Sequence, residues 1–177
     1  MSGSVSRERQ KGRPADTEEA LERLLKTFEA YYTVNRETPA EPFRAEAEFR
    51  MHDEQYFLIK SAKVTEYDSR EFLFFAVTDR LTAELYETLD ERAWEEGLSR
   101  VEVKPNHRNT DISLLILADR VDPEAAALIR KRRRYKSYRF GFRGWSAYKV
   151  IAYDLESGTT VQNRMGDAMR QIFSNIF

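Results

Sequence analysis

The chain contains no cysteine, and this absence removes several kinds of chemistry at once. Without thiols there are no disulfides, no thiolate nucleophile and no zinc site built on sulfur. A reducing compartment such as the cytoplasm fits this composition. Histidine is nearly as scarce, since only His52 and His107 are present. Neither histidine lies at a spacing typical of metal ligands, so we expect both to be solvated and we expect no metal site and no cofactor.

Long apolar runs are also absent. The longest, Phe72 to Val77 and Leu114 to Ala118, are far shorter than the roughly 20 residues that a membrane-spanning helix needs. The first 16 residues are polar and lack the apolar stretch of a secretory signal. We therefore expect a cytoplasmic protein with no membrane partner.

Glycine is limited to seven scattered residues, and none of them forms a glycine-rich phosphate-binding turn between a strand and a helix. No serine lies in a nucleophile-elbow pattern. Since thiols are absent and histidines are few, nucleophilic catalysis has few candidate residues. These absences favour a binding function over an enzymatic one.

The apolar residues that are present suffice for one domain. The 177 residues are 41% hydrophobic, which provides a single sizeable core. Residues 1–16 are rich in Gly, Ser, Pro and positive charge and show no periodic apolar pattern, so we expect a disordered N-terminal arm. Residues 17–177 form the predicted domain.

Helical and strand patterns alternate along this domain. Capping signals begin helices at Asp16 and Asp122, and apolar spacing predicts further helices over 81–96 and 161–176, with Gly97 following the first of these two. Alternating or continuous apolar residues predict seven strands, at 45–51, 56–64, 72–77, 101–103, 112–118, 136–142 and 145–155. The predicted class is a single α+β domain of order αβββαββαββα. Its sheet is largely antiparallel and covered by helices, and strands 72–77 and 112–118 are central.

A weak internal repeat has an offset of 40 residues. Phe72 to Glu84 lies over Ile112 to Glu124, and both copies run from a strand through Asp-Arg to a capped helix. Either a duplication or shared helix-capping chemistry explains this pattern.

Two resemblances to known proteins follow from these patterns. The run Tyr138-Arg-Phe-Gly-Phe-Arg-Gly-Trp145, followed by Asp154-Leu155 and Asn163-Arg164, resembles an uncharacterised bacterial domain family of unknown function. That resemblance covers mainly residues 138–164 and implies no catalytic residue. The order of the elements is similar to that of secretion-chaperone-like α+β domains.

One tripeptide raises an enzymatic alternative. Glu102-Val103-Lys104 matches the Glu-x-Lys tripeptide of a nuclease superfamily, in which the acid binds a divalent cation and the lysine positions water. On a strand both side chains share one face. The acid that should precede them is missing, and Asp111 follows instead. A divalent-metal nuclease around Glu102, Lys104 and Asp111 is therefore the alternative to a surface ion pair.

The most unusual feature is a basic run. Residues 130–143 hold eight of the 29 basic residues and no acidic one, whereas the rest of the chain holds 21 basic and 30 acidic residues. The run ends a helix and enters a predicted strand, in which Tyr138, Phe140 and Phe142 would share one face. We expect arginine heads such as those of Arg132, Arg133 and Arg139 to extend into water. The candidate binding residues are Arg130, Lys131, Arg132, Arg133, Arg134, Lys136, Arg139, Arg143 and Trp145.

Three interpretations of the run are open. Cations interleaved with aromatics suit an anionic ligand or a nucleic acid. The same run can instead pair with an acidic protein surface, either the acidic segment 79–96 of this molecule or that of a second copy in a homodimer. In the third interpretation it is ordinary solvated surface. The sequence therefore predicts a non-catalytic interaction module for an acidic protein or a nucleic acid.

Overall fold

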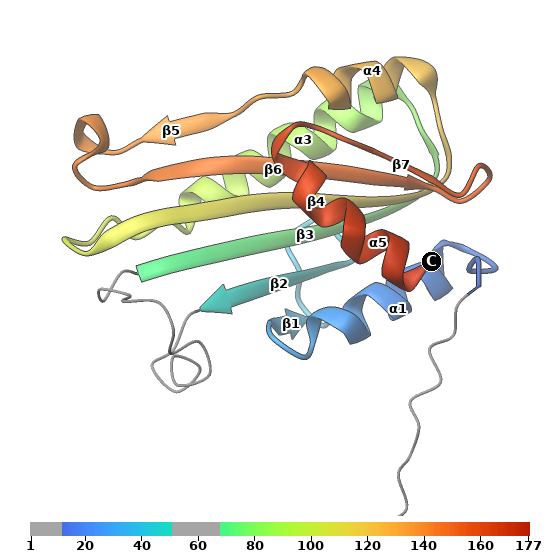
Figure 1. The fold of residues 1–177 in the computed structure, drawn as a ribbon, viewed down its shortest axis with the longest axis horizontal. Helices are drawn as coiled ribbons and strands as arrows, with labels where there is room; N and C mark the ends of the chain where they lie inside the picture. Colours follow the sequence, from blue (N-terminus) through green and yellow to red (C-terminus); the bar gives the residue numbers. More distant parts are fainter. Residues whose placement is uncertain (1–11, 51–67) are drawn as a thin grey trace, which may run out of the picture.

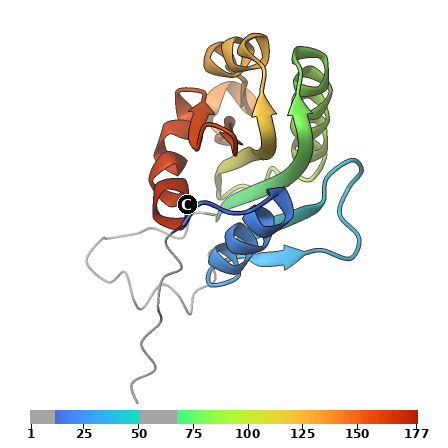
Figure 2. The same ribbon diagram turned by 90° about the vertical axis from the view of Figure 1, so that its right-hand side faces the viewer.

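The computed structural model describes residues 12–50 and 68–177, which form one sheet with helices on both faces (Figures 1 and 2). The strands are β1 (Thr33–Asn35), β2 (Ala45–Arg50), β3 (Asp68–Leu81), β4 (His107–Val121), β5 (Tyr135–Ser137), β6 (Trp145–Asp154) and β7 (Thr159–Gln162). The α-helices are α1 (Thr17–Phe28), α3 (Ala83–Ser99), α4 (Pro123–Lys131) and α5 (Arg170–Ile176). Two short 3₁₀ helices are η2 (Arg139–Gly141) and η3 (Met165–Met169).

The sheet is mixed, and its three longest strands are neighbours. The strand order is β1-β2-β3-β4-β6-β5, and β7 pairs with the carboxyl-terminal half of β6. Within the described residues four pairings are antiparallel, whereas β3–β4 and β4–β6 are parallel. Helices α3 and α4 lie on the chain between these parallel strands, as parallel connections require. The centre of the sheet is therefore buried on both sides.

Alternate residues of the central strands point into two separate cores. Phe74, Leu114 and Val150 pack under α3 and α4 on one face. On the opposite face Phe75, Leu115 and the neighbouring strand residues pack under α1 and α5. The end-on view of Figure 2 shows the two pairs of helices on either side of the strands.

Three α-helices begin at a polar N-cap residue, and at two of them the side chain makes a capping hydrogen bond. The Asp16 carboxylate accepts a hydrogen bond from the Glu19 N–H at 2.8 Å, and the Thr82 hydroxyl accepts one from the Leu85 N–H at 3.2 Å. Asp122 is also an N-cap residue, but its carboxylate makes no capping bond and instead binds Arg80 at 2.9 and 3.1 Å.

The predicted class is confirmed, although individual elements differ. The described residues contain the expected seven strands and four α-helices, most strand pairings are antiparallel, and β3 and β4 are central. Residues 101–103 are not a strand, and the predicted strand 136–142 ends at Ser137. Strands β1 and β7 were not predicted, and the last helix starts at Arg170 rather than near Val161. The predicted strand 56–64 and His52 lie outside the described residues.

Gly97 was expected to follow α3, but it lies inside the helix. A Cβ at this position would come within 2.6 Å of the Ile112 side chain on β4. The glycine therefore serves the close approach of α3 to the sheet and does not end the helix.

Residues 12–16, at the end of the predicted N-terminal arm, contact the rest of the fold. Pro14 is buried, and the Gly12 carbonyl accepts a hydrogen bond from Arg23 on α1. The remainder of the arm, residues 1–11, lies outside the described residues. Among the helices of the described chain, none has the length and apolar character needed to span a membrane.

The buried side chain of Asn163 hydrogen-bonds to the edge of β6, between the segments of β6 that pair with β5 and with β7. The Asn163 side chain accepts hydrogen bonds from the N–H groups of Val150 and Gly166, at 3.1 and 2.8 Å. Its amide donates to the carbonyls of Tyr148 and Arg132, at 3.0 and 3.2 Å. The Tyr148 carbonyl and the Val150 N–H lie on β6 between the residues that pair with β5 and those that pair with β7, so they have no strand partner, and the asparagine side chain takes that place.

We expect Asn163→Ala to lower the free energy of unfolding by about 2–3 kcal/mol, because it leaves several buried backbone groups without partners. Urea unfolding followed by circular dichroism measures this loss. Asn175→Ala is the matched control, since Asn175 is exposed on α5, and it should change stability by less than about 0.5 kcal/mol. Equal stability of the two variants would contradict the role given to Asn163.

Candidate functional site

The basic run follows one edge of the sheet. Arg130 and Lys131 end α4, residues 132–134 lead into the edge strand β5, and the chain then turns through η2 into β6 (Figure 1). We call residues 130–145 the basic-aromatic hairpin. It contains all nine candidate binding residues, which the structure therefore brings onto one continuous edge.

Two arginines of this hairpin point inward, onto α3. Arg134 binds the Asp90 carboxylate through Nε at 3.0 Å and Nη2 at 2.6 Å. Arg132 reaches the same carboxylate at 3.1 Å. Asp90 is fully buried (0% exposed) and also accepts a hydrogen bond from the Tyr86 hydroxyl at 2.9 Å. Each arginine has a second acidic partner on α3, Glu87 for Arg132 and Glu91 for Arg134.

This cluster bears on two expectations, the solvation of Arg132 and the pairing of the basic run with an acidic surface. Arg132 does not extend into water, because it is held by Asp90 and Glu87 and its guanidinium lies 5.6 Å from the Tyr86 ring centre. Burial and the Asp90 carboxylate raise the pKa of Tyr86, so its hydroxyl stays a donor at neutral pH. Part of the basic run therefore pairs with the acidic helix within the molecule. Pairing across a homodimer stays a prediction.

The other six cations of the hairpin make no ion pair with the described residues. Four of them, Arg130, Lys131, Arg133 and Lys136, lie on the edge between α4 and β5, and Arg139 and Arg143 flank the turn. All except Arg143 are exposed. Lys136 also lies 5.7 Å from the ring centre of Tyr138. Since β5 lies at the edge of the sheet, these positive charges face a side of the molecule that is open in the described structure.

The turn between β5 and β6 presents two phenylalanines to solvent. Phe140 is 100% exposed and Phe142 is 87% exposed, whereas the sequence pattern placed both on one face of a strand. The strand stops because Arg139 and Phe140 adopt φ angles of 47° and 55°, in the left-handed region. Each non-glycine residue in that region costs roughly 1–2 kcal/mol. Phe140 recovers none of this cost by packing, which points to a use outside the folded domain.

The base of the turn, in contrast, is firmly held. The Tyr138 N–H donates to the Gly144 carbonyl at 2.9 Å, and the Tyr138 hydroxyl shares a hydrogen bond with Ser146 at 2.8 Å. Gly144 has a φ of 76°, and a Cβ there would lie 1.9 Å from the Arg108 carbonyl oxygen, so only glycine fits. The tip of the turn therefore projects from a base that hydrogen bonds hold in place.

His107 helps to mount this projection. It is buried, and its ring nitrogens lie 2.7 Å from the Arg143 carbonyl oxygen and 3.0 Å from the Thr110 hydroxyl. Its ring meets Tyr138 edge-on at 5.5 Å. The expectation of a solvated histidine was therefore wrong for His107. Trp145, the last candidate, is half-buried at the start of β6, where it pairs with Ser137 and Asn109.

The three residues of the nuclease alternative are not brought together. Glu102 and Lys104 form an ion pair with each other at 2.7 Å on an irregular, exposed segment. The Lys104 hydrogen bond, together with the charge of Arg70, lowers the pKa of Glu102. Asp111 lies on β4 and binds Lys149 at 2.8 Å. The register of β3 with β4 puts Arg70 and Asp111 on opposite faces of the sheet. Because Glu102 lies beside Arg70, Asp111 faces away from Glu102.

Asp111 belongs to a polar cluster that sequence reasoning did not assemble. Lys149 on β6 bridges Asp111 and Glu71, with Nζ to oxygen distances of 2.8 and 3.0 Å. Glu71 also accepts hydrogen bonds from the hydroxyls of Ser113 and Tyr32, at 2.8 and 2.7 Å. Burial opposes the charged form of Lys149, but the two carboxylates outweigh it and raise the pKa of this lysine. The lysine is thus fully engaged and is unsuited to act as a nucleophile.

Metal ligands do not gather in the described residues either. No group of three or more histidine, aspartate or glutamate side chains lies close enough to hold an ion in residues 12–50 and 68–177. The hairpin is therefore the candidate functional site with the clearest geometry. In the sequence, the alternation of side chains along an extended basic run could have indicated which cations face solvent. Nothing in the sequence indicated the strained turn.

Comparison with known proteins extends the resemblance seen in the sequence. A family model described as a domain of unknown function, DUF8052, matches residues 16–175. No curated protein and no solved structure matches the chain. The match confirms the resemblance to a family of unknown function noted for residues 138–164 and extends it over nearly the whole chain. It shows neither a bacterial origin nor a likeness to secretion chaperones.

We expect Asp90→Asn to lower the free energy of unfolding by about 2–3 kcal/mol, since removing one partner of a buried ion pair leaves the others uncompensated. Limited trypsin digestion should also cut faster after Arg132 and Arg134. The control is Glu87→Gln on the exposed side of α3, which should cost about 0.5 kcal/mol or less. Unchanged stability and digestion in Asp90→Asn would contradict an anchoring role.

Lys149→Met should be destabilising by about 2 kcal/mol at pH 8, because Glu71 and Asp111 would then carry two partly buried charges without a counter-charge. The deficit should shrink as pH rises above about 10.5, because the pKa of Lys149 is raised in the folded state and the stability that its charge contributes is lost as pH passes that value. Thermal unfolding of wild type and variant across this pH range measures the effect. A deficit that is independent of pH would show that Lys149 contributes by packing alone.

Proposed function

This chain belongs to the DUF8052 family, and we propose that it is a non-catalytic binding module that holds single-stranded nucleic acid with the basic-aromatic hairpin. The observation that carries the proposal is the turn at residues 138–144, where Phe140 and Phe142 are exposed to solvent and the backbone of Phe140 is strained. Strain that the fold itself does not use is typical of binding elements.

The distribution of charge supports a polymeric anion. Arg133 and Lys136 lie on the extended segment and β5, at a rise of about 3.3 Å per residue, and Arg139 and Arg143 continue the series at the turn. The cations therefore follow a line and do not converge on one point. A line of separate positive charges suits a phosphate backbone, whose charges are also arranged in a line.

The exposed rings support single strands in particular. Phe140, Phe142 and Tyr135 (64% exposed) offer aromatic faces beside the cations. Unpaired bases stack on such rings whatever their identity, and each stacked base contributes about 1–3 kcal/mol. One way in which a protein partner meets an edge strand is backbone pairing. Strand β5 is only three residues long and charged, which are features that oppose edge-to-edge pairing, including that of a homodimer.

The test is fluorescence anisotropy with a labelled single strand of about 12 nucleotides, long enough for one binding site. Wild-type affinity should fall with salt, at a logarithmic slope of about −0.7 per phosphate contacted. The double change Arg133→Glu and Arg139→Glu should flatten this slope. The double change Phe140→Ser and Phe142→Ser should keep the slope and weaken binding by at least about tenfold, through lost stacking.

Each double variant should fold normally, because all four side chains are exposed and unpaired among the described residues. Lys26→Glu with Arg120→Glu is the matched charge control, since both cations are exposed and lie outside the hairpin. It should bind like wild type. No saturable binding at about 50 mM salt, or equal loss in the control, would show that the proposal is wrong. If the charge variant, Arg133→Glu with Arg139→Glu, then fails to form a complex with an acidic protein that the wild type binds, the partner is an acidic protein and not a nucleic acid.

A further inference from the structure

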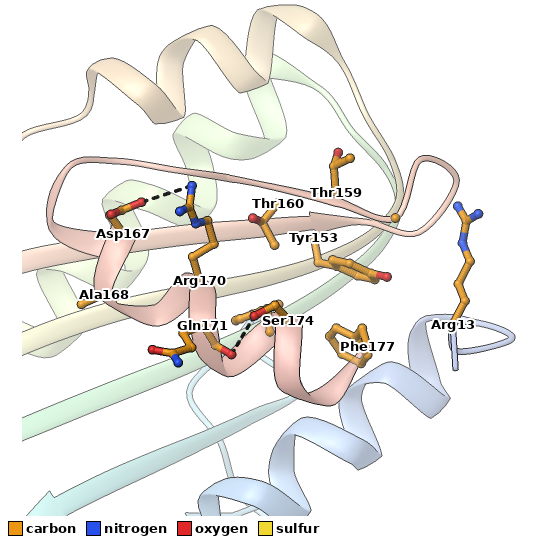
Figure 3. Close-up of a pocket in the computed structure, with 12 residues that line it drawn as sticks. Arg13, Tyr153, Thr159, Thr160, Asp167, Ala168, Arg170, Gln171, Ser174 and Phe177 are labelled. Atoms are coloured by element: carbon orange, nitrogen blue, oxygen red, sulfur yellow. Dashed lines mark hydrogen bonds and ion pairs between the residues drawn. The ribbon is translucent and has the colours of Figure 1, made fainter. Parts of the chain in front are cut away.

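A second feature is an open groove of about 960 Å³ beside α5, next to the carboxyl-terminal end of β6 (Figure 3). One wall is α5 with the preceding residues Asp167 and Ala168, another is the β6–β7 hairpin, and Arg13 closes one end. Pockets that hold small organic ligands span about 300–1,000 Å³. The groove is therefore large enough for a ligand of one or two rings.

Two hydrogen-bond donors at one end of this groove have no partner in the described structure. The Arg13 guanidinium carbon and the Tyr153 hydroxyl oxygen both lie 3.9 Å from the point that a Cβ at Gly158 would occupy. Neither forms an ion pair or a hydrogen bond with the described residues. The nearby Asp154 carboxylate accepts the N–H groups of Val121 and Ser157, at 2.9 and 2.7 Å, and its charge acts on Arg13 without forming an ion pair with it.

The other end of the groove is also rich in donors. The Arg170 Nη1 atom lies 3.8 Å from the Asp167 Oδ1 atom. This ion pair is long and exposed, so most of the guanidinium can still donate hydrogen bonds to a ligand. Figure 3 shows the Thr160 side chain between Arg170 and Tyr153. Two arginines and four hydroxyl-bearing side chains line the groove, against one acidic side chain, and this balance favours an anion.

The floor of the groove is aromatic. Tyr153 stacks on Phe177, with ring centres 4.5 Å apart and planes 24° from parallel. Phe173 meets Phe177 edge-on at 5.8 Å. Tyr153 and Phe173 are buried, so this floor is an extension of the core beneath α1 and α5 and is already ordered before any ligand arrives. Flat apolar rings pack well against such a surface.

We infer that this groove binds an organic anion in which a flat ring carries a phosphate or carboxylate group. The anionic group is held by Arg13 and the Tyr153 hydroxyl, and the ring rests on Phe177. This site is separate from the hairpin and does not depend on the nucleic-acid proposal. It is a binding site, since none of its side chains forms a nucleophile and base pair.

The experiment is isothermal titration of the full chain with phenyl phosphate, in parallel with inorganic phosphate, which lacks the ring, and benzyl alcohol, which lacks the charge. Phenyl phosphate should bind at least about tenfold more tightly than either, because it alone uses both the donors and the floor. Arg13→Ala should weaken its binding by about tenfold. Benzoate in place of phenyl phosphate tells whether a carboxylate serves as well.

Two variants separate ligand contact from a structural effect. Tyr153→Phe removes only the hydroxyl and keeps the ring stack, so it should weaken phenyl phosphate several-fold while leaving the melting temperature unchanged. Arg120→Ala removes an exposed arginine elsewhere and should bind like wild type. The inference is overturned if phenyl phosphate shows no saturable binding at millimolar concentration. It is equally overturned if Arg13→Ala and Tyr153→Phe bind as Arg120→Ala does.

Discussion

The ion cluster at Asp90 is the interaction on which the arrangement of the candidate site depends. A fully buried carboxylate is costly unless several donors surround it, and Asp90 obtains them from Tyr86 on its own helix and from two arginines of a distant segment. Because Arg132 and Arg134 must both reach α3, the chain after α4 is held extended against that helix. The same extended path delivers residues 135–137 to the edge of β6. One buried charge thus links α3, the edge strand and the orientation of the neighbouring cations.

The alternation that this path imposes divides the basic run into two roles. Side chains two residues apart share a face of an extended chain, so holding Arg132 and Arg134 inward turns Arg133 outward. The inward arginines neutralise the acidic face of α3 within the molecule. The outward cations then have no acidic residue of the described chain beside them, and their field acts on the surroundings. A run that reads as eight equivalent charges in sequence therefore divides into two arginines that anchor it to α3 and six cations that make no ion pair with the described residues.

Two repeated units in the sequence prove to be neighbours in space. From Ser69 onward, residues of β3 pair with those 40 positions later in β4, as in Phe72 with Ile112 and Leu81 with Val121. The weak repeat thus coincides with the register of two parallel strands, and Arg80 of one unit binds Asp122 of the other. This register does not decide between duplication and shared capping chemistry. It does explain why the same Asp-Arg and capping residues recur, since both strands end at the same edge of the sheet and both start a helix there.

The sequence alone determined the class of the fold, the two central strands, the starts of the first three α-helices and the presence of the basic run. These features follow from local physics, because apolar periodicity and capping residues act within one element. The end of the strand at Ser137 was decided only by the tertiary structure, since the aromatic alternation through Phe142 favours a strand, whereas Arg139 and Phe140 adopt left-handed φ angles that turn the chain back. The pairing of Lys149 with Glu71 and Asp111, and the burial of His107, likewise join residues that are distant in sequence. The local sequence pattern shows which side chains are polar. Only the packing of strands and helices decides which of these side chains have partners inside the molecule and which stay exposed to solvent.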